Sequence, residues 1–269
     1  MLKIFRAVAV GLSGLSAIVF TLSAEAQEDV RNPQCLPASI LETGSGYGRC
    51  NYSPGVNYIG TYSDYLPNGR GIYTLSDGTR YEGEFVNGVL EGQGRLILPS
   101  DARYEGVFRN GAIRRGTAFY PNGDRYEGEF GVTSRTEVVT ENIIVDLSVA
   151  GRPILEPRET TRQFDSSQPD GQGTYTFANG NRFVGEFFAG EPFGQGTFYH
   201  STGTVCEGYF YTRNFDAENA TCNYPDGRRY VGELRQARPH GTGTMTLQDG
   251  RTIQGAFRAG QPVSFSGYQ

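Results

Sequence analysis

The most constraining feature of this sequence is a short pattern that recurs along most of the chain. Residues 81–85 read Tyr-Glu-Gly-Glu-Phe, and residues 104–108 read Tyr-Glu-Gly-Val-Phe. Related openings begin at residues 58, 81, 104, 126, 183, 206, 230 and 253, so most intervals are 23 residues, with one of 22, one of 24 and one of 57. Repeats of about 20–50 residues are typical of stacked units that bury their apolar faces against their neighbours. The sequence therefore predicts a tandem array.

Each unit has the pattern of a β-hairpin. Apolar and polar residues alternate from Tyr81 to Val86, as in a half-buried strand. Asn87-Gly88 then tolerates the positive φ of a hairpin turn, and residues 94–98 form the return strand. No sustained helical periodicity follows residue 26. The predicted fold is all-β: an elongated, single-layer antiparallel β-meander of tandem hairpins.

The repeated aromatic positions are expected to form a column along one face of the sheet. Because Gly83 has no side chain, a neighbouring ring can lie close over the backbone there. The column consists of Tyr58, Tyr81, Phe85, Tyr104, Phe108, Tyr126, Phe130, Phe183, Phe187 and Tyr230.

The spacing of aromatic and glycine residues resembles the MORN repeat. The shared pattern is Tyr-x-Gly-x-Phe, a turn glycine, a Gly-x-Gly pair such as Gly92/Gly94, and a closing turn such as Asp77-Gly78. It covers most of residues 58–260, in about eight units with a degenerate first one. The resemblance implies a hairpin meander that binds proteins and often self-associates, and a membrane-lipid role has been proposed for some members. Two units depart from the pattern, at Arg114-Arg115-Gly116 and at Glu218-Asn219-Ala220, where local regularity is in question.

The four cysteines can be paired from the repeat register. Cys206 occupies the opening position of its unit, and Cys222 lies on the return strand of that unit. The segment Cys50-Asn-Tyr repeats Cys222-Asn-Tyr at the same distance from the next unit, which makes residues 35–57 a degenerate first unit. The register predicts the disulfides Cys35–Cys50 and Cys206–Cys222, which an exported location would permit.

The N-terminal residues have the layout of a secretory signal peptide. Lys3 and Arg6 precede an apolar run over residues 7–22, and Ala24-Glu25-Ala26 matches a cleavage site. The expected organisation is a signal peptide at 1–26, a linker at 27–34 and a repeat domain at 35–269. The alternative is an uncleaved anchor, but the apolar run is shorter than a spanning helix needs. We expect a periplasmic or extracellular protein.

One unit carries an insert at about residues 131–168. The interval from Tyr126 to Phe183 is 57 residues, 34 more than the usual 23, and the unit's two ends keep the pattern. The insert is a candidate binding element, because loops of this length are often functional. Its alternative is a tolerated surface loop. The candidate residues, in segments that read as strands, are Val138, Val139, Ile143, Ile144, Val145, Leu147 and Val149.

Candidate catalytic chemistry is sparse. His200 and His240 stand alone, and neither a Gly-x-Ser-x-Gly elbow nor a His or Cys metal spacing occurs. The acidic positions Glu82, Glu84, Glu105, Glu127, Glu129, Glu186, Glu207 and Glu233 recur in register, and most stand two or four residues after Arg80, Arg103, Arg125, Arg182 or Arg229. Paired carboxylates can hydrolyse glycosides, but a solvated Glu/Arg ladder explains this recurrence more simply. We predict no catalytic residue, metal or cofactor.

These observations favour an exported, non-catalytic scaffold for protein–protein interaction or self-association at the cell envelope or outside the cell. The expected partner is an unidentified protein or a second copy of the chain. The net charge of −5 is unsuited to nucleic acid. The alternative function is recognition of a lipid head group or glycan by the aromatic face of the sheet.

Overall fold

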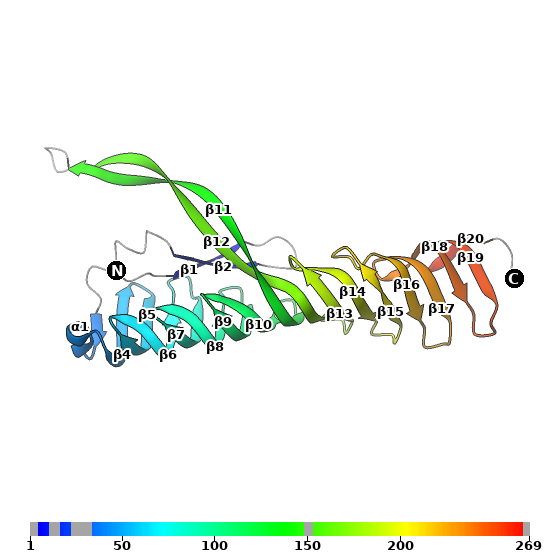
Figure 1. Cartoon of the computed structure of the whole chain (residues 1–269), viewed down its shortest axis with the longest axis horizontal. Helices are drawn as coiled ribbons and strands as arrows, with labels where there is room; N and C mark the ends of the chain where they lie inside the picture. The colour runs from blue at the N-terminus through cyan, green and yellow to red at the C-terminus, as the bar shows by residue number, and fades with distance from the viewer. Residues whose placement is uncertain (1–4, 11–16, 23–33, 148–152, 266–269) are drawn as a thin grey trace.

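The protein is a single, elongated, one-layer sheet (Figure 1). The computed structural model describes residues 5–10, 17–22, 34–147 and 153–265, with side chains for 34–52, 54–132 and 167–263. Within these residues, strands β3 to β20 form an antiparallel meander in which each strand pairs with the next along the chain. This open 18-strand meander confirms the predicted fold class.

The elements follow the repeat register. Their bounds are β1 Phe5–Val10, β2 Ala17–Leu22, β3 Gln34–Leu36, α1 Ser39–Thr43, β4 Gly46–Ser53, β5 Val56–Ser63, β6 Leu66–Thr74, β7 Arg80–Val86, β8 Val89–Ile97, β9 Arg103–Arg109, β10 Ala112–Phe119, β11 Arg125–Leu147, β12 Pro153–Thr176, β13 Arg182–Phe188, β14 Glu191–Tyr199, β15 Val205–Phe210, β16 Ala217–Asn223, β17 Arg229–Arg235, β18 Arg238–Thr246, β19 Thr252–Arg258 and β20 Gln261–Phe265.

The hairpin tips have the turn chemistry that their sequences predict. Asn87 and Gly88 both have positive φ, +50° and +79°, between the paired residues Val86 and Val89. Two central residues with positive φ define the tight turn whose twist matches the flanking strands. The Asn-Gly pair therefore sets the register of β7 against β8.

A line of glycines crosses the sheet from strand to strand. Gly83 pairs with Gly71 on one neighbour and with Gly94 on the other. A Cβ at Gly83 would lie 2.5 Å from Tyr81 Oη and 2.6 Å from the Cα of Gly94, too close for any side chain. The line contains Gly48, Gly60, Gly71, Gly83, Gly94, Gly106, Gly116, Gly128, Gly173, Gly185, Gly196, Gly208, Gly232, Gly243 and Gly255.

The tyrosine rings lie over this glycine line and form the core. Tyr81 donates from its hydroxyl to the carbonyl of Glu84, three residues along its own strand. Its ring packs edge-to-face against Phe85 and against Phe108 of the next unit, with centroids 5.2 and 5.1 Å apart. All ten predicted column residues are buried. The rings are buried by their contacts with one another and with the glycine line, on strands that are curved (Figure 1).

The unit that opens with Cys206 in place of an aromatic residue shows why glycine is needed where a ring is present. Cys206 replaces the aromatic residue there, and Ala220 takes the glycine-line position beside Gly208. Without a ring across the backbone, the Ala220 methyl group has room, and the line continues from Ala220 to Gly232. At the second departure, Gly116 keeps its place between Gly106 and Gly128, with a register shift after Ile113. The sheet therefore stays continuous through both departures.

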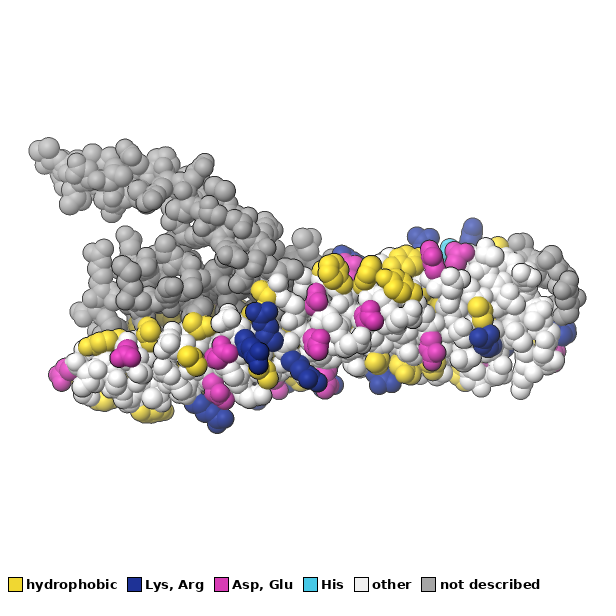
Figure 2. Space-filling view, in the orientation of Figure 1, with side chains coloured by type: hydrophobic (Ala, Val, Ile, Leu, Met, Phe, Trp, Pro, Cys, Tyr) yellow, Lys and Arg dark blue, Asp and Glu magenta, His cyan; other side chains and the backbone are white. Residues whose placement is uncertain are grey.

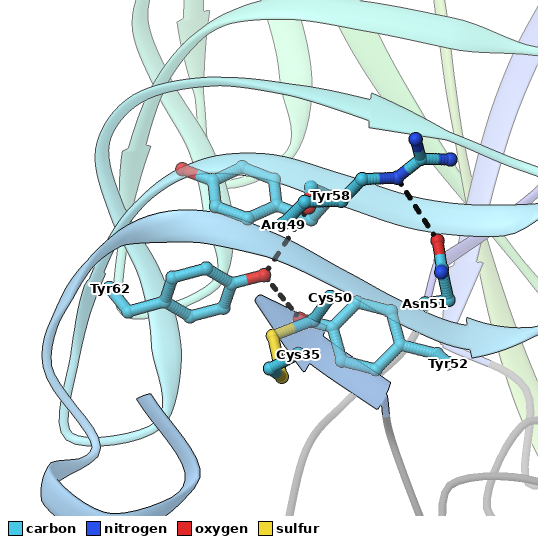
Figure 3. The surroundings of a disulfide bond; sticks show 7 residues. All are labelled: Cys35, Arg49, Cys50, Asn51, Tyr52, Tyr58 and Tyr62. Atoms are coloured by element: carbon cyan, nitrogen blue, oxygen red, sulfur yellow. Dashed lines mark hydrogen bonds between the residues drawn. A yellow bond between two sulfur atoms is a disulfide. The ribbon is translucent and has the colours of Figure 1, made fainter. Parts of the chain in front are cut away.

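Both predicted disulfides are confirmed. Cys35 bonds to Cys50 across β3 and β4, and Cys206 bonds to Cys222 across β15 and β16. In the first unit, α1 replaces a hairpin tip and buries Ile40 at the end of the sheet. Beside its disulfide, the hydroxyls of Tyr52 and Tyr62 are 3.3 Å apart (Figure 3).

The N-terminal segment contributes two strands outside the meander. β1 pairs with β2, and β2 pairs with β12 at residues 165–167. Cleavage at Ala26, which lies outside the described residues, would remove both strands. The signal peptide and its cleavage stay a prediction.

Candidate interaction surface

The outer face of the sheet, opposite the aromatic column, carries Glu/Arg pairs, but more of them lie within one strand than across strands, where the ladder was expected. Arg80 pairs with Glu82 at 3.1 Å, and Arg125 pairs with Glu127 at 2.6 Å, each two residues apart on one strand. Glu105 contacts both Arg95 and Arg103. These side chains are largely exposed, so each pair stabilises the fold by about 1 kcal/mol or less.

The second glutamate of the pattern has a structural position. The Glu233 carboxylate accepts a hydrogen bond of 2.9 Å from the backbone N–H of Thr242, beside the register shift that follows Gly232. Glu84 and Glu129 lie in the same way against Gly92 and Gly171, both of which have positive φ. These contacts give the recurring carboxylates a structural role.

The remaining candidates for chemistry are dispersed. His200 Nε2 lies 2.9 Å from the carbonyl oxygen of Ala237, and its ring packs edge-to-face against Phe198. The His240 carbonyl accepts from Tyr230 on the neighbouring strand. Among the residues with described side chains, no group of three or more His, Cys, Asp or Glu is placed to hold a metal ion. In the same residues no helix has the length and hydropathy to cross a bilayer.

The aromatic column presents no ligand surface. Tyr58, Tyr104 and Phe183 are almost fully buried, and the rings of the column contact one another or the glycine line. The burial of these rings argues against recognition of a lipid head group or glycan through them, the alternative function expected from the sequence. The alternation of residues identified the residues of the column, but it did not show that their rings would be buried.

The insert extends one hairpin into a two-stranded arm. β11 and β12 continue far beyond the body of the sheet (Figure 1). Phe130 pairs with Pro169 and Gly131 with Gln168, as in an ordinary unit, so the additional residues are 132–147 on β11 and 153–167 on β12. β12 begins at Pro153 and runs through Pro157, which a strand with an open edge tolerates.

The candidate residues of the insert lie along this arm. Val138 and Val139 pair with Thr161 and Thr160, whereas Ile143 and Ile144 pair with Glu156 and Leu155. Val145 lies at a register shift, and Leu147 pairs with Pro153 at the last described position of β11. Val149 lies outside the described residues.

Sequence reasoning missed a second surface feature, an exposed aromatic cluster on the outer face. Phe188, Phe193 and Tyr209 come from β13, β14 and β15, and they contact one another. Other units have polar residues at most of these positions, so a comparison position by position could have found the cluster.

The fold and these surfaces define a non-globular β-hairpin repeat protein. Five segments match the family model of the MORN repeat, at residues 58–80, 81–103, 163–182, 183–205 and 230–250. The chain is a MORN-repeat protein. The match at 163–182 covers only the second half of the interrupted unit, because the insert separates it from residues 126–130.

Comparisons with other proteins add little to this assignment. A search of curated proteins gave no match. Among solved structures, the chain aligns with the TCP domain of Drosophila melanogaster SAS-4 in complex with a proline-rich motif of Ana2, at 10% identity and a TM-score of 0.36, covering 72% of this chain and 88% of that one. It also aligns with the G-box domain of the microcephaly protein CPAP, at 13% identity and a TM-score of 0.36, covering 94% and 100%. The TCP10 domain of Danio rerio CPAP with a STIL peptide gives 12% identity and a TM-score of 0.21, covering 71% and 81%. Alignments at these TM-scores establish nothing about the partners of this chain.

Proposed function

We propose that this chain is an exported, non-catalytic scaffold that binds a protein partner or a second copy of itself through the β11–β12 arm. The observation that carries the proposal is the arm itself. Its extra residues form 15 cross-strand pairs, a ribbon roughly 50 Å long at about 3.3 Å per residue. The repeat architecture does not require this extension.

The physical argument concerns the open edges of the ribbon. In the described chain, β11 beyond Gly131 pairs only with β12, and the added part of β12 has a further strand partner only at residues 165–167. Isolated two-stranded ribbons are marginally stable in water, and unpaired strand edges are templates for pairing with another chain. Addition of a partner strand would satisfy these edges and cover the apolar positions.

Export supports the same proposal. The N-terminal residues fit a signal peptide, and both disulfides suit an oxidising compartment. Cleavage near Ala26 would also remove β2 from the arm and free residues 165–167 for a partner. The site of action would be the periplasm, the cell envelope or the exterior.

The test is a shortened protein in which residues 132–167 are replaced by Asn-Gly. This join puts Gly131 and Gln168 on either side of a two-residue turn, the arrangement that Phe188 and Glu191 have around Ala189-Gly190. The expected result is a folded, monomeric protein that loses its dimer or partner. Sedimentation velocity would measure self-association, and pull-downs from the cell envelope with parent and shortened proteins would compare partners.

A second variant separates apolar contact from length. Replacing Ile143, Ile144 and Leu147 together by Thr keeps strand propensity and the full arm while lowering its hydrophobicity. We expect weaker association than in the parent. A shortened protein that unfolds would assign the arm to structural packing, and one that folds and binds as the parent does would refute the proposal.

A further inference from the structure

The exposed aromatic cluster places large rings at positions where most other units have polar residues. Phe188, Phe193 and Tyr209 have exposed fractions of 63%, 46% and 43%. Their ring centroids are 6.0 Å apart between Phe188 and Phe193, and 5.8 Å apart between Phe193 and Tyr209. In the unit at 58–80, the equivalent residues are Ser63, Asn68 and Thr61. The three rings form one contiguous surface that the core does not use.

The surroundings of the cluster are acidic. Tyr209 pairs across the strands with Gln195 on one side and with Glu218 on the other. Tyr211, 43% exposed, shares a shallow hollow of about 550 Å³ with Tyr209 and Glu218. Partial burial raises the pKa of the Tyr211 phenol, and nearby carboxylates, first that of Glu218, raise it further. Figure 2 shows hydrophobic side chains gathered over β13–β15 with Asp and Glu side chains beside them.

This charge contrasts with that of the N-terminal half of the sheet. Strands β5–β10 and their turns contain seven arginines and seven acidic residues, so their formal charge is balanced. Strands β13–β16 and their turns contain two arginines and five acidic residues, a formal charge of −3. Of these acids, Glu191 is paired with Arg213 at 2.5 Å. Within the residues whose side chains are described, Glu186, Glu207 and Glu218 have no ion-pair partner.

We infer that the aromatic cluster and its acidic border bind an extended, Lys- or Arg-bearing segment of a partner protein. Cationic side chains are attracted to aromatic faces, and their aliphatic stems can cover the exposed rings. The unpaired carboxylates beside the rings supply the complementary charge and favour association with a basic partner. The structure itself provides one cation of this kind on the same part of the sheet, where the guanidinium carbon of Arg182 lies 4.3 Å from the centroid of the Tyr199 ring.

This inference is a second protein-binding surface within the proposed scaffold function and does not depend on the arm. The shortened protein without residues 132–167 retains the cluster, and we expect it to bind a basic peptide as the parent does. A failure at the arm and a failure at the cluster are therefore separate results.

The experiment uses a fluorescent ten-residue peptide of alternating Arg and Ser, with a Glu–Ser peptide of the same length for comparison. Fluorescence anisotropy measures binding to the exported protein. The first variant is Phe188→Ser/Phe193→Asn/Tyr209→Thr, which copies the residues of the unit at 58–80 and adds no charge. Exposed cation–π contacts account for about two- to fivefold in affinity each, so we expect a loss of about tenfold or more. Circular dichroism should show an unchanged fold.

The second variant, Glu207→Gln/Glu218→Gln, keeps the rings and removes charge beside them. We expect a loss of about three- to tenfold that shrinks as salt is raised from 50 to 200 mM. The matched control is Glu127→Gln, which removes the same kind of charge from an Arg-paired site and should change affinity less than twofold.

Three results would overturn the inference. In the first, the aromatic variant binds the Arg–Ser peptide as tightly as the parent. In the second, the Glu–Ser peptide binds as well as the Arg–Ser peptide, which would mean that the surface is simply apolar. In the third, the aromatic variant abolishes dimerisation of the parent without affecting the peptide, which would assign the cluster to a second copy of the chain.

Discussion

Replacing Gly94 by Ala should destabilise the protein, because the added methyl group would clash with the ring of Tyr81. A Cβ at Gly94 would lie 2.5 Å from Cζ and 2.6 Å from Cε2 of Tyr81, about 1 Å inside a normal carbon contact. The ring cannot easily move, because it is buried and packs against Phe85 and Phe108. Overpacking of this kind costs about 1–3 kcal/mol, and the lower chain entropy of Ala offsets about 0.5–1 kcal/mol of it. We expect a net loss of about 1–2 kcal/mol.

A double-mutant cycle isolates the ring as the cause. Tyr81→Ile installs the residue that the last unit has at this position, Ile253, and removes the ring. In that background Gly94→Ala should be neutral or slightly stabilising, which gives a coupling energy of about 1–2 kcal/mol. Urea unfolding monitored by circular dichroism measures all four proteins. Because repeat arrays can unfold in parts, hydrogen exchange of β7 and β8 should show the same order.

The matched control moves a methyl group from one strand to its neighbour in the unit that opens with Cys206 and therefore has no aromatic ring at that position. Gly208→Ala combined with Ala220→Gly transfers the methyl group between neighbouring strands, where Cys206 replaces the aromatic residue. We expect a change below about 1 kcal/mol. If Gly94→Ala costs the same with and without the Tyr81 ring, close approach of the ring does not explain the glycine line.

Further outcomes follow from the disulfides, the acidic residues and the buried tyrosines. Peptide mapping without reduction should find Cys35 bonded to Cys50 and Cys206 bonded to Cys222, and crossed pairs would contradict the repeat register. The variant Cys206→Ser/Cys222→Ser should lower the free energy of unfolding by about 3 kcal/mol. Glu127→Gln/Glu129→Gln should leave the fold and binding intact, because the exposed Arg125–Glu127 pair is worth about 1 kcal/mol or less and Gln keeps an acceptor oxygen at position 129 beside Gly171; a hydrolase activity lost in this variant would refute the non-catalytic proposal. Burial raises the pKa of Tyr52 and of Tyr230 to about 12 in the folded protein, above the value near 10 of an unfolded chain. Their contribution to stability is therefore full below about pH 10 and is lost as pH rises toward about 12, with a slope of about 1.4 kcal/mol per pH unit for each tyrosine that titrates. Urea midpoints measured from pH 8 to 11.5 should fall above pH 10, and less steeply in Tyr230→Phe; midpoints that stay constant to pH 11.5 would be evidence against ionisable tyrosines in the core.

Most of the fold could be predicted from the sequence because one set of residues decides both register and packing. The Asn87-Gly88 turn sets which residues pair, and the pairing brings Gly83 and Gly94 under the ring of Tyr81. The same register located both disulfides. By contrast, α1 has five residues, too few for a helical period to be recognised.

The surfaces were less predictable, for physical reasons. Proline in a sequence usually argues against a strand, so Pro153 and Pro157 concealed the length of β12. Alternation showed which residues share a face, but it could not show that the face with Tyr58 and Phe85 would be closed to solvent. The exposed rings of Phe188 and Phe193 looked like two more aromatic residues in an aromatic-rich chain.

The two faces of the array are under different constraints, and this difference indicates where binding should be sought. On the inner face, ring and glycine must fit each other, so a change at Cys206 is matched by a change at Ala220 on the neighbouring strand. On the outer face the exposed rings of Phe188 and Phe193 have no such match, and an aromatic residue at position 193 gains nothing for the core. Exposing a large ring to water is unfavourable unless another molecule covers it. In the unit at 183–205 the inner residues Phe183 and Phe187 keep the repeat pattern while Phe188 and Phe193 break it. Some outer-face residues differ from the repeat pattern in a unit whose inner-face residues keep it. At these outer-face positions we expect a repeat array of this kind to bind a partner.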